Sequence, residues 1–182
     1  MFHLIEKAKA FATKAHNGQT RKNSNSPYVT HPIRVAKILQ DAGFNDELIC
    51  AGFLHDVVED TSFTINDIEK VFGLAVAELV AAHTEDKTKS WQERKQHTID
   101  TVKLAPTEVK YLIVADKLDN LLGLEKDLQV HGETIWKNFN AGYEKQKWYN
   151  DSIVKNMYIG LNNEDIPDYF KEYEEAVKRF FH

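Results

Sequence analysis

The sequence has a single cysteine, Cys50, and only four prolines and eight glycines among its 182 residues. One cysteine cannot form an intramolecular disulfide or a cysteine metal cage, so a metal in this chain must be held by His, Asp and Glu. No stretch of about 18 uncharged apolar residues is present, which argues against a membrane-spanning helix. Glu6 and Lys7 stand where a signal peptide has its apolar centre, so we expect a soluble, cytoplasmic protein.

An excess of positive charge is also missing. Lys and Arg number 23 against 28 Asp and Glu, which gives a formal net charge of −5. Broad binding to nucleic acid or to an anionic membrane needs a basic face, so both partners are excluded, and an anionic substrate would need a local basic pocket. The length fits one domain of roughly 100–200 residues.

Apolar residues recur at helical spacing and predict helices over about 3–16, 32–42 and 106–124 and a last helix that Pro167 opens. A polar segment, GQTRKNSNSPYVT, predicts a long loop before His31, which Pro32 places at the mouth of the second helix. We found no alternating strand runs and no repeats, so the predicted fold class is all-α, a single domain. Helix starts are predicted at Asp46 as an N-cap of a helix through ELICAGFLHDVVED and at the capping boxes of Thr64 with Asp67 and Ser90 with Glu93.

Polar side chains interrupt two apolar helices. HDVVED at 55–60 follows an apolar run, and on one continuous helix His55, Asp56, Glu59 and Asp60 share one side. Burying carboxylates beside a histidine is costly unless they are paired or bound to a cation, so a metal site explains the cluster. The alternative is an acidic helix end that faces water. Asp116 favours the metal site, because it interrupts the apolar run YLIVADKLDNLL, with Asn120 one turn later on the same face.

The order THP, HDVVED and ADKLDN, at 30–32, 55–60 and 115–120, resembles the HD-domain metal phosphohydrolases. Within them it is most similar to the hydrolase domain of the RelA/SpoT alarmone family, and TEDKTKSWQERK at 84–95 resembles the stand-alone small alarmone hydrolases of the metazoan SpoT homologue type. The resemblance covers roughly residues 8–125, which we expect to be the family-like core, with a helical C-terminal extension over about 131–182.

The resemblance implies an activity and the residues that carry it. Family members remove pyrophosphate from the 3′ position of guanosine 3′,5′-bis(diphosphate), (p)ppGpp, giving GDP or GTP, which is a cytoplasmic reaction of the stringent response. Glu59 and Asp60 match the catalytic acidic pair, with the division of acid and base roles open. Arg21, Lys22 and Asn120 match residues that bind the nucleotide. The family's metal ligands, usually for Mn²⁺, are matched by His31, His55, Asp56 and Asp116; this donor set does not by itself separate Mn²⁺ from Fe²⁺ or Zn²⁺.

One departure leaves the substrate open. After the asparagine, alarmone hydrolases commonly carry an Arg and then a small polar or acidic residue, whereas Leu122 and Gly123 stand here. A second reading is therefore an HD phosphohydrolase acting on another nucleotide or a phosphorylated metabolite. A third is a non-catalytic module that keeps the pocket as a sensor. The aromatic C-terminal helix fits either a cover for the core or the surface of a homodimer.

Two other groups of residues have simpler interpretations. His83 and His97 lie between the HD pair and Asp116, where some HD proteins place ligands for a second metal, but we expect packing or surface roles for both. A second basic group could reach a 5′ diphosphate, but we favour a solvated helix face for it. Its members are Lys87, Lys89, Arg94 and Lys95.

Overall fold

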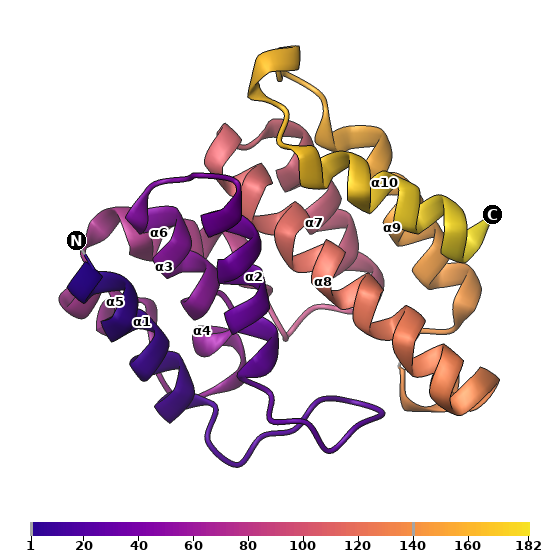
Figure 1. The fold of residues 1–182 in the computed structure, drawn as a ribbon, viewed down its shortest axis with the longest axis horizontal. Helices are drawn as coiled ribbons and strands as arrows, with labels where there is room; N and C mark the ends of the chain where they lie inside the picture. Colours follow the sequence, from indigo (N-terminus) through magenta and orange to yellow (C-terminus); the bar gives the residue numbers. More distant parts are fainter. Residues whose placement is uncertain (1, 140) are drawn as a thin grey trace.

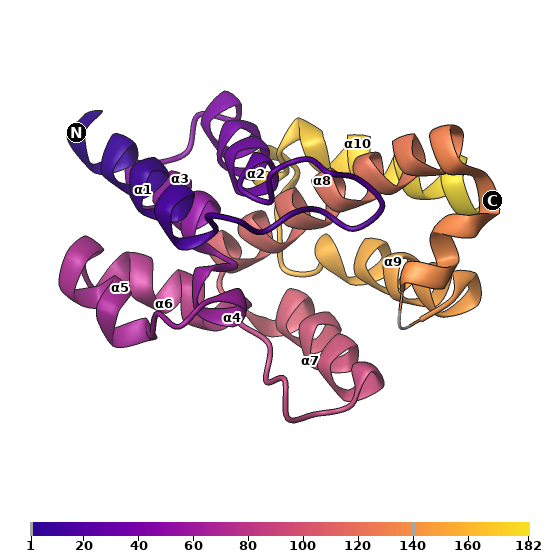
Figure 2. The same ribbon diagram turned by 90° about the horizontal axis from the view of Figure 1, so that it is seen from below.

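One long helix lies at the centre of the fold. The computed structural model describes residues 2–139 and 141–182 (Figure 1). Its helices are α1 (Phe2–Ala15), α2 (Thr30–Asp41), α3 (Asp46–Leu54), α4 (Val57–Asp60), α5 (Ile65–Phe72), α6 (Leu74–His83), α7 (Trp91–Leu104), α8 (Thr107–His131), η1 (Gly132–Asn138), α9 (Tyr143–Met157), η2 (Asn163–Asp165) and α10 (Asp168–Phe181). α8 packs against α2, α3, α6, α7, α9 and α10. In both ribbon views α1, α3, α5 and α6 lie to one side, α9 and α10 to the other, and α8 spans the two groups (Figure 1, Figure 2).

The all-α prediction is confirmed. Within the described residues, β pairing is limited to one isolated bridge between Thr20 and Pro27 in the loop before α2. None of the helices in residues 2–139 and 141–182 combines the length and the apolar content that crossing a membrane requires. The expectation that the 182 residues form one domain, with a core that ends near 125, stays a prediction.

The burial of the first half of α8 explains why its sequence there is mainly apolar. Every residue from Val109 to Asp116 is buried, which is typical of a helix enclosed by others. The helix begins after Pro106, as predicted, but it continues to His131 instead of ending near 124. It ends at Gly132, whose φ of 63° lies in the left-handed region that glycine adopts without strain.

Helix starts follow the predicted capping chemistry with two corrections. Both capping boxes, at Thr64 and at Ser90, are present. The N-cap of α3 is Asn45 and not Asp46, because the Asn45 side chain accepts the Leu48 N–H at 2.9 Å. α2 begins at Thr30, so His31 lies inside its first turn instead of before it. Proline at the next position is tolerated there, since first-turn N–H groups lack helical partners.

The helix predicted to run through HDVVED is broken, and that prediction was wrong. α3 ends at Leu54 and α4 begins at Val57, with His55 and Asp56 in the turn between them. The Gly52 carbonyl, which the Asp56 N–H would use in a continuous helix, accepts a hydrogen bond from His55 Nδ1 at 2.8 Å. The histidine side chain therefore supports the break that separates the two short helices.

Gly52 sets the distance between α2 and α3. A Cβ atom at this position would lie 2.9 Å from Ala36 Cα and 2.9 Å from Leu39 Cδ1, and backbone cannot yield to it. We expect Gly52→Ala to lower the free energy of unfolding by about 1–3 kcal/mol through overpacking, measured as a lower urea midpoint. Gly142→Ala is the matched control, because no atom lies within 4 Å of its added Cβ. Equal midpoints for the two variants would show that the close approach is not limiting.

Candidate metal centre and acidic pair

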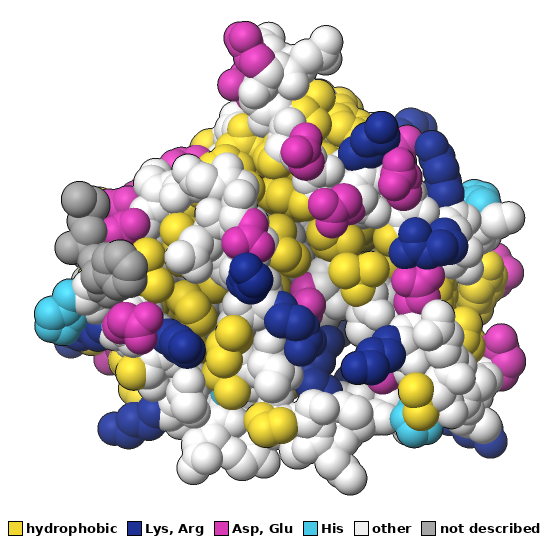
Figure 3. Space-filling view, in the orientation of Figure 1, with side chains coloured by type: hydrophobic (Ala, Val, Ile, Leu, Met, Phe, Trp, Pro, Cys, Tyr) yellow, Lys and Arg dark blue, Asp and Glu magenta, His cyan; other side chains and the backbone are white. Residues whose placement is uncertain are grey.

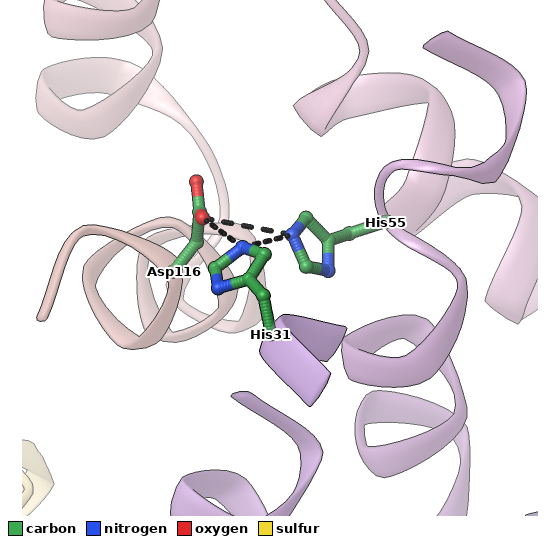
Figure 4. A group of neighbouring side chains, drawn as sticks. All are labelled: His31, His55 and Asp116. Atoms are coloured by element: carbon green, nitrogen blue, oxygen red, sulfur yellow. Dashed lines mark hydrogen bonds and ion pairs between the residues drawn. The ribbon is translucent and has the colours of Figure 1, made fainter. Parts of the chain in front are cut away.

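Three helices bring His31, His55 and Asp116 together at the centre of the molecule. His31 comes from the first turn of α2, His55 from the turn after α3 and Asp116 from the middle of α8 (Figure 4). The two Nε2 atoms are 3.2 Å apart. Asp116 Oδ1 lies 3.0 Å from His31 Nε2 and 3.5 Å from His55 Nε2. All three side chains are buried.

Asp56 completes the set of four residues that the sequence groups as metal ligands. Its Oδ2 atom lies 3.0 Å from His55 Nε2 and 3.6 Å from His31 Nε2, and it accepts a hydrogen bond from the Tyr28 hydroxyl at 2.6 Å. Two imidazole nitrogens and one oxygen from each of two carboxylates therefore face one small volume. The structure brings all four residues together.

Hydrogen bonds at the far side of each ring fix which nitrogen faces this volume. His31 Nδ1 lies 2.6 Å from Asp119 Oδ2, and His55 Nδ1 lies 2.8 Å from the Gly52 carbonyl. Both partners can only accept, so Nδ1 carries the hydrogen in each ring, and a neutral ring then presents a bare Nε2 lone pair. Two lone pairs and two carboxylates at these distances repel one another unless a cation lies between them. The donor set fits a borderline to hard divalent cation.

The pKa of His55 also reflects the excess of negative charge at the centre. Burial lowers the pKa of His55, but the neighbouring carboxylates of Asp56 and Asp116 raise it by more, so the pKa lies well above its ordinary value. A proton on the ring and a cation in the site answer the same excess of negative charge.

The acidic pair lies on α4, beside Asp56. Asp56, Glu59 and Asp60 each offer a carboxylate oxygen, and these oxygens lie within 4.8 Å of one another. Glu59 Oε1 accepts the backbone N–H of Glu85 at 2.7 Å. Burial and the charge of Asp56 raise the pKa of Glu59 to about 7. Asp60 Oδ1 instead accepts from Lys87 Nζ at 2.5 Å. Glu59 is thus placed to exchange a proton near neutral pH.

Two of the three predicted substrate-binding residues reach the centre. Arg21 Nη2 donates to Asn120 Oδ1 at 3.0 Å, and Asn120 Nδ2 donates to Asp116 Oδ1 at 2.8 Å. Lys22 is directed elsewhere, with its Nζ 5.1 Å from the centre of the Phe139 ring. Figure 3 shows Lys and Arg side chains at several places on one face, with a group of them close together below its middle, although the whole chain is acidic.

The solvated-face interpretation of the second basic group was wrong for half of its members. The Arg94 and Lys95 side chains are only 19% and 17% exposed and form ion pairs with Glu85 at 2.8 Å and 2.6 Å. Lys87 is exposed but paired with Asp60, and Lys89 is exposed. Helical spacing did not identify the inward pair, because its partner Glu85 lies in the preceding loop.

Four residues around the centre were missed by sequence reasoning: Tyr28, His83, Lys117 and Asp119. His83, interpreted as a packing residue, lies 2.9 Å by its Nε2 from Asp116 Oδ2, which also accepts from Lys117 at 2.7 Å. Tyr28, in the polar loop, gave no local signal. Asp119 had one, since it follows Asp116 by three residues and so lies on a similar side of α8. His97 is exposed on α7, as expected.

Comparison with known proteins agrees with this geometry. The family model described as HD domain matches residues 8–142. The guanosine-3′,5′-bis(diphosphate) 3′-pyrophosphohydrolase MESH1 of Homo sapiens is 40% identical over 98% of this chain and 92% of its own length. The enzyme of the same name from Drosophila melanogaster is 43% identical over 69% of this chain and 70% of its own length.

Two solved structures share the fold. A Listeria monocytogenes EGD-e protein of known crystal structure is 53% identical, with a TM-score of 0.79 over 83% of this chain and 98% of that one. A metazoan ortholog of SpoT that hydrolyzes ppGpp is 31% identical, with a TM-score of 0.78 over 98% of this chain and 97% of that one. With its helical fold and the family model matched over most of its length, the chain belongs to the HD domain family.

Proposed function

We propose that this chain is a metal-dependent hydrolase that removes the 3′-pyrophosphate from guanosine 3′,5′-bis(diphosphate). The observation that carries the proposal is the buried meeting of two imidazole Nε2 atoms with two carboxylates, directly beside the acidic pair of α4. Support comes from relatives named for this reaction, which match nearly the whole chain in both directions.

His31, His55, Asp56 and Asp116 are the residues that would hold the metal, and Mn²⁺ is the ion we propose. A divalent cation bound there supplies Lewis-acid stabilisation of the charge that develops on the phosphoryl oxygens. The protein's contribution is to hold both Nε2 lone pairs in place through their Nδ1 partners. The remaining residues bind the substrate and move the proton.

Glu59 is the residue that we assign to proton transfer. Its pKa of about 7 lets it accept a proton from the attacking water and return it to the departing 3′ oxygen, a poor leaving group without protonation. Asp60 is less suited to this role, because the Lys87 ammonium occupies its Oδ1 atom. Its charge instead helps to keep the pKa of Glu59 high. Arg21 and Asn120, joined to each other beside Asp116, would bind the nucleotide.

A second candidate is hydrolysis of another nucleotide or of a phosphorylated metabolite. Its specific support is the position of Leu122 and Gly123, which depart from the family pattern. A Cβ atom on Gly123 would lie 4.0 Å from Arg21 Nη2, so position 123 faces a proposed substrate-binding residue. Leu122 beside it is 41% exposed. The cytoplasmic location, the homodimer and the choice of Mn²⁺ over Fe²⁺ or Zn²⁺ stay predictions.

Product analysis with Mn²⁺ tests the proposal. We expect guanosine tetraphosphate to give pyrophosphate and GDP, with the activity lost on chelation and in Asp56→Ala. GTP and a nucleoside monophosphate serve as parallel substrates. Metal-dependent turnover of these alone would favour the second candidate, and no turnover of guanosine tetraphosphate by a metal-loaded protein would contradict the first.

Two substitutions should separate metal binding from proton transfer. We expect Asp116→Ala to lose tight binding of Mn²⁺, because it removes a carboxylate from between the two histidines. Glu59→Gln should keep the metal and lower kcat by about 10²–10⁴-fold, the usual contribution of a general acid or base. Calorimetry with Mn²⁺ and pyrophosphate release provide the two readouts. Full turnover by Glu59→Gln would mean that the proton-transfer role is misassigned.

The pH dependence of kcat/KM should identify Glu59 as the titrating base. The ionised form must accept the proton, so we expect kcat/KM to rise with pH, to be half-maximal near pH 7 and to level off above it, with the whole curve at lower pH where the bound cation favours the carboxylate. In Asp60→Asn the rising limb should move to lower pH, because the charge of Asp60 raises the pKa of Glu59. A limb that stays in place, or that falls with pH, would contradict the assignment.

A further inference from the structure

We propose that Asp119, held by Arg34, is a positioning residue that orients His31 and strengthens it as a ligand for the divalent cation. This inference rests on the proposed metal site and names a residue outside the predicted ligand set. It concerns the side of the His31 ring that faces away from the centre, where a carboxylate occupies the second nitrogen.

Asp119 contacts His31 in a buried place. Its Oδ2 atom lies 2.6 Å from His31 Nδ1, and the two side chains are 7% and 1% exposed. Because the carboxylate accepts the Nδ1 hydrogen, the Nε2 lone pair is left to face the centre. Asp116, one turn earlier on the same helix, meets that Nε2 atom from the other side at 3.0 Å. Two carboxylates of α8, those of Asp116 and Asp119, therefore contact the two nitrogens of the His31 ring.

The two histidines of the centre differ in this respect. His55 Nδ1 donates to a neutral backbone carbonyl, that of Gly52, at 2.8 Å. His31 Nδ1 donates to an ionised side chain, which makes a shorter and stronger hydrogen bond. A carboxylate on the distal nitrogen fixes the tautomer and restricts rotation of the ring. His31 is thus the more firmly oriented imidazole of the pair.

Arg34 orients the Asp119 carboxylate. Its Nε donates to Oδ1 at 2.7 Å and its Nη2 to Oδ2 at 3.1 Å, a bidentate contact that fixes the carboxylate plane. Arg34 follows His31 by three residues on α2, so one turn of helix supplies both partners of the carboxylate. The Arg34 side chain is 49% exposed, whereas the Asp119 side chain is 7% exposed, so the arginine holds the buried carboxylate from the solvent side.

Mn²⁺ affinity of the whole protein, measured by calorimetry, tests the role. Asp119→Asn keeps the size of the side chain and loses its charge, and we expect the Kd for Mn²⁺ to rise about 10–100-fold, as for other residues that orient metal ligands. Arg34→Gln leaves the carboxylate on His31, so its Kd should change only a few-fold. At low Mn²⁺ the turnover of Asp119→Asn should be lower than that of the unaltered protein. At saturating Mn²⁺ most of this difference should disappear.

Glu125→Gln is the matched control. It breaks an equivalent bidentate pair on the same helix, with Arg179 at 2.6 Å and 3.0 Å, and touches no proposed ligand. We expect its Kd for Mn²⁺ to equal that of the unaltered protein. If Asp119→Asn lowers the melting temperature as much as Glu125→Gln does and leaves the Kd unchanged, Asp119 is structural and the inference is wrong.

A second measurement does not depend on any variant folding. Nitrogen NMR of the histidine-labelled protein should find His31 protonated at Nδ1 both with and without Mn²⁺, and a bare Nδ1 would overturn the inference. Failure of the proposed metal site would give a different result. In that case the Kd for Mn²⁺ would be the same in Asp116→Ala as in the unaltered protein, or the unaltered protein would bind no Mn²⁺.

Discussion

The structure depends on balancing negative charge that is buried at one point. Each of the two carboxylates has an oxygen within 3.6 Å of both imidazole Nε2 atoms, and all four side chains are buried. Removing such groups from water costs several kcal/mol per ion unless partners compensate. The loop before α2, α6 and α8 supply such partners: the Tyr28 hydroxyl, the His83 ring, the Lys117 ammonium and the Asn120 amide all donate to these carboxylates. The fold is built around a cation-binding requirement.

Close packing of short helices around the long α8 brings these groups together. Because Gly52 has no side chain, α3 packs so closely against α2 that a Cβ atom at this position would collide with Ala36. In this close packing the Nε2 atoms of His31 and His55 lie 3.2 Å apart. The break after Leu54 then turns Asp56 toward the same volume, and α4 presents the acidic pair beside it. A continuous helix would have spread these groups along its length. Gly52 and the turn at His55 and Asp56 thus determine both the packing of α3 and the geometry of the proposed metal site.

Much of this could be read from the sequence, for identifiable reasons. Capping boxes and apolar periodicity are local, so α1 and α2 and the starts of α3, α5, α7, α8 and α10 were predicted to within a few residues. The helices α6 and α9 were not predicted separately, and α8 extends further than predicted. Asp116 was recognisable because it interrupts an apolar run, and the full set of proposed ligands followed from the resemblance to the HD-domain phosphohydrolases. The break at His55 was not, since it depends on a side chain that bonds the Gly52 carbonyl. Asp119 and His31 are 88 residues apart in sequence, and only the folded chain reveals that they touch.

The charges at the centre also explain how an acidic protein can attract an anionic nucleotide. When all are ionised, the carboxylates of the centre and of the acidic pair carry four negative charges, and each of Lys87 and Lys117 offsets one of them. Glu59, whose pKa is about 7, loses part of its charge near neutral pH. A divalent cation offsets the charge that remains. Asp119 and Arg34 cancel each other. Arg21 then remains as positive charge, because the atom it binds is the neutral Asn120 oxygen. The attraction for phosphate is therefore local, and removing the cation should weaken it.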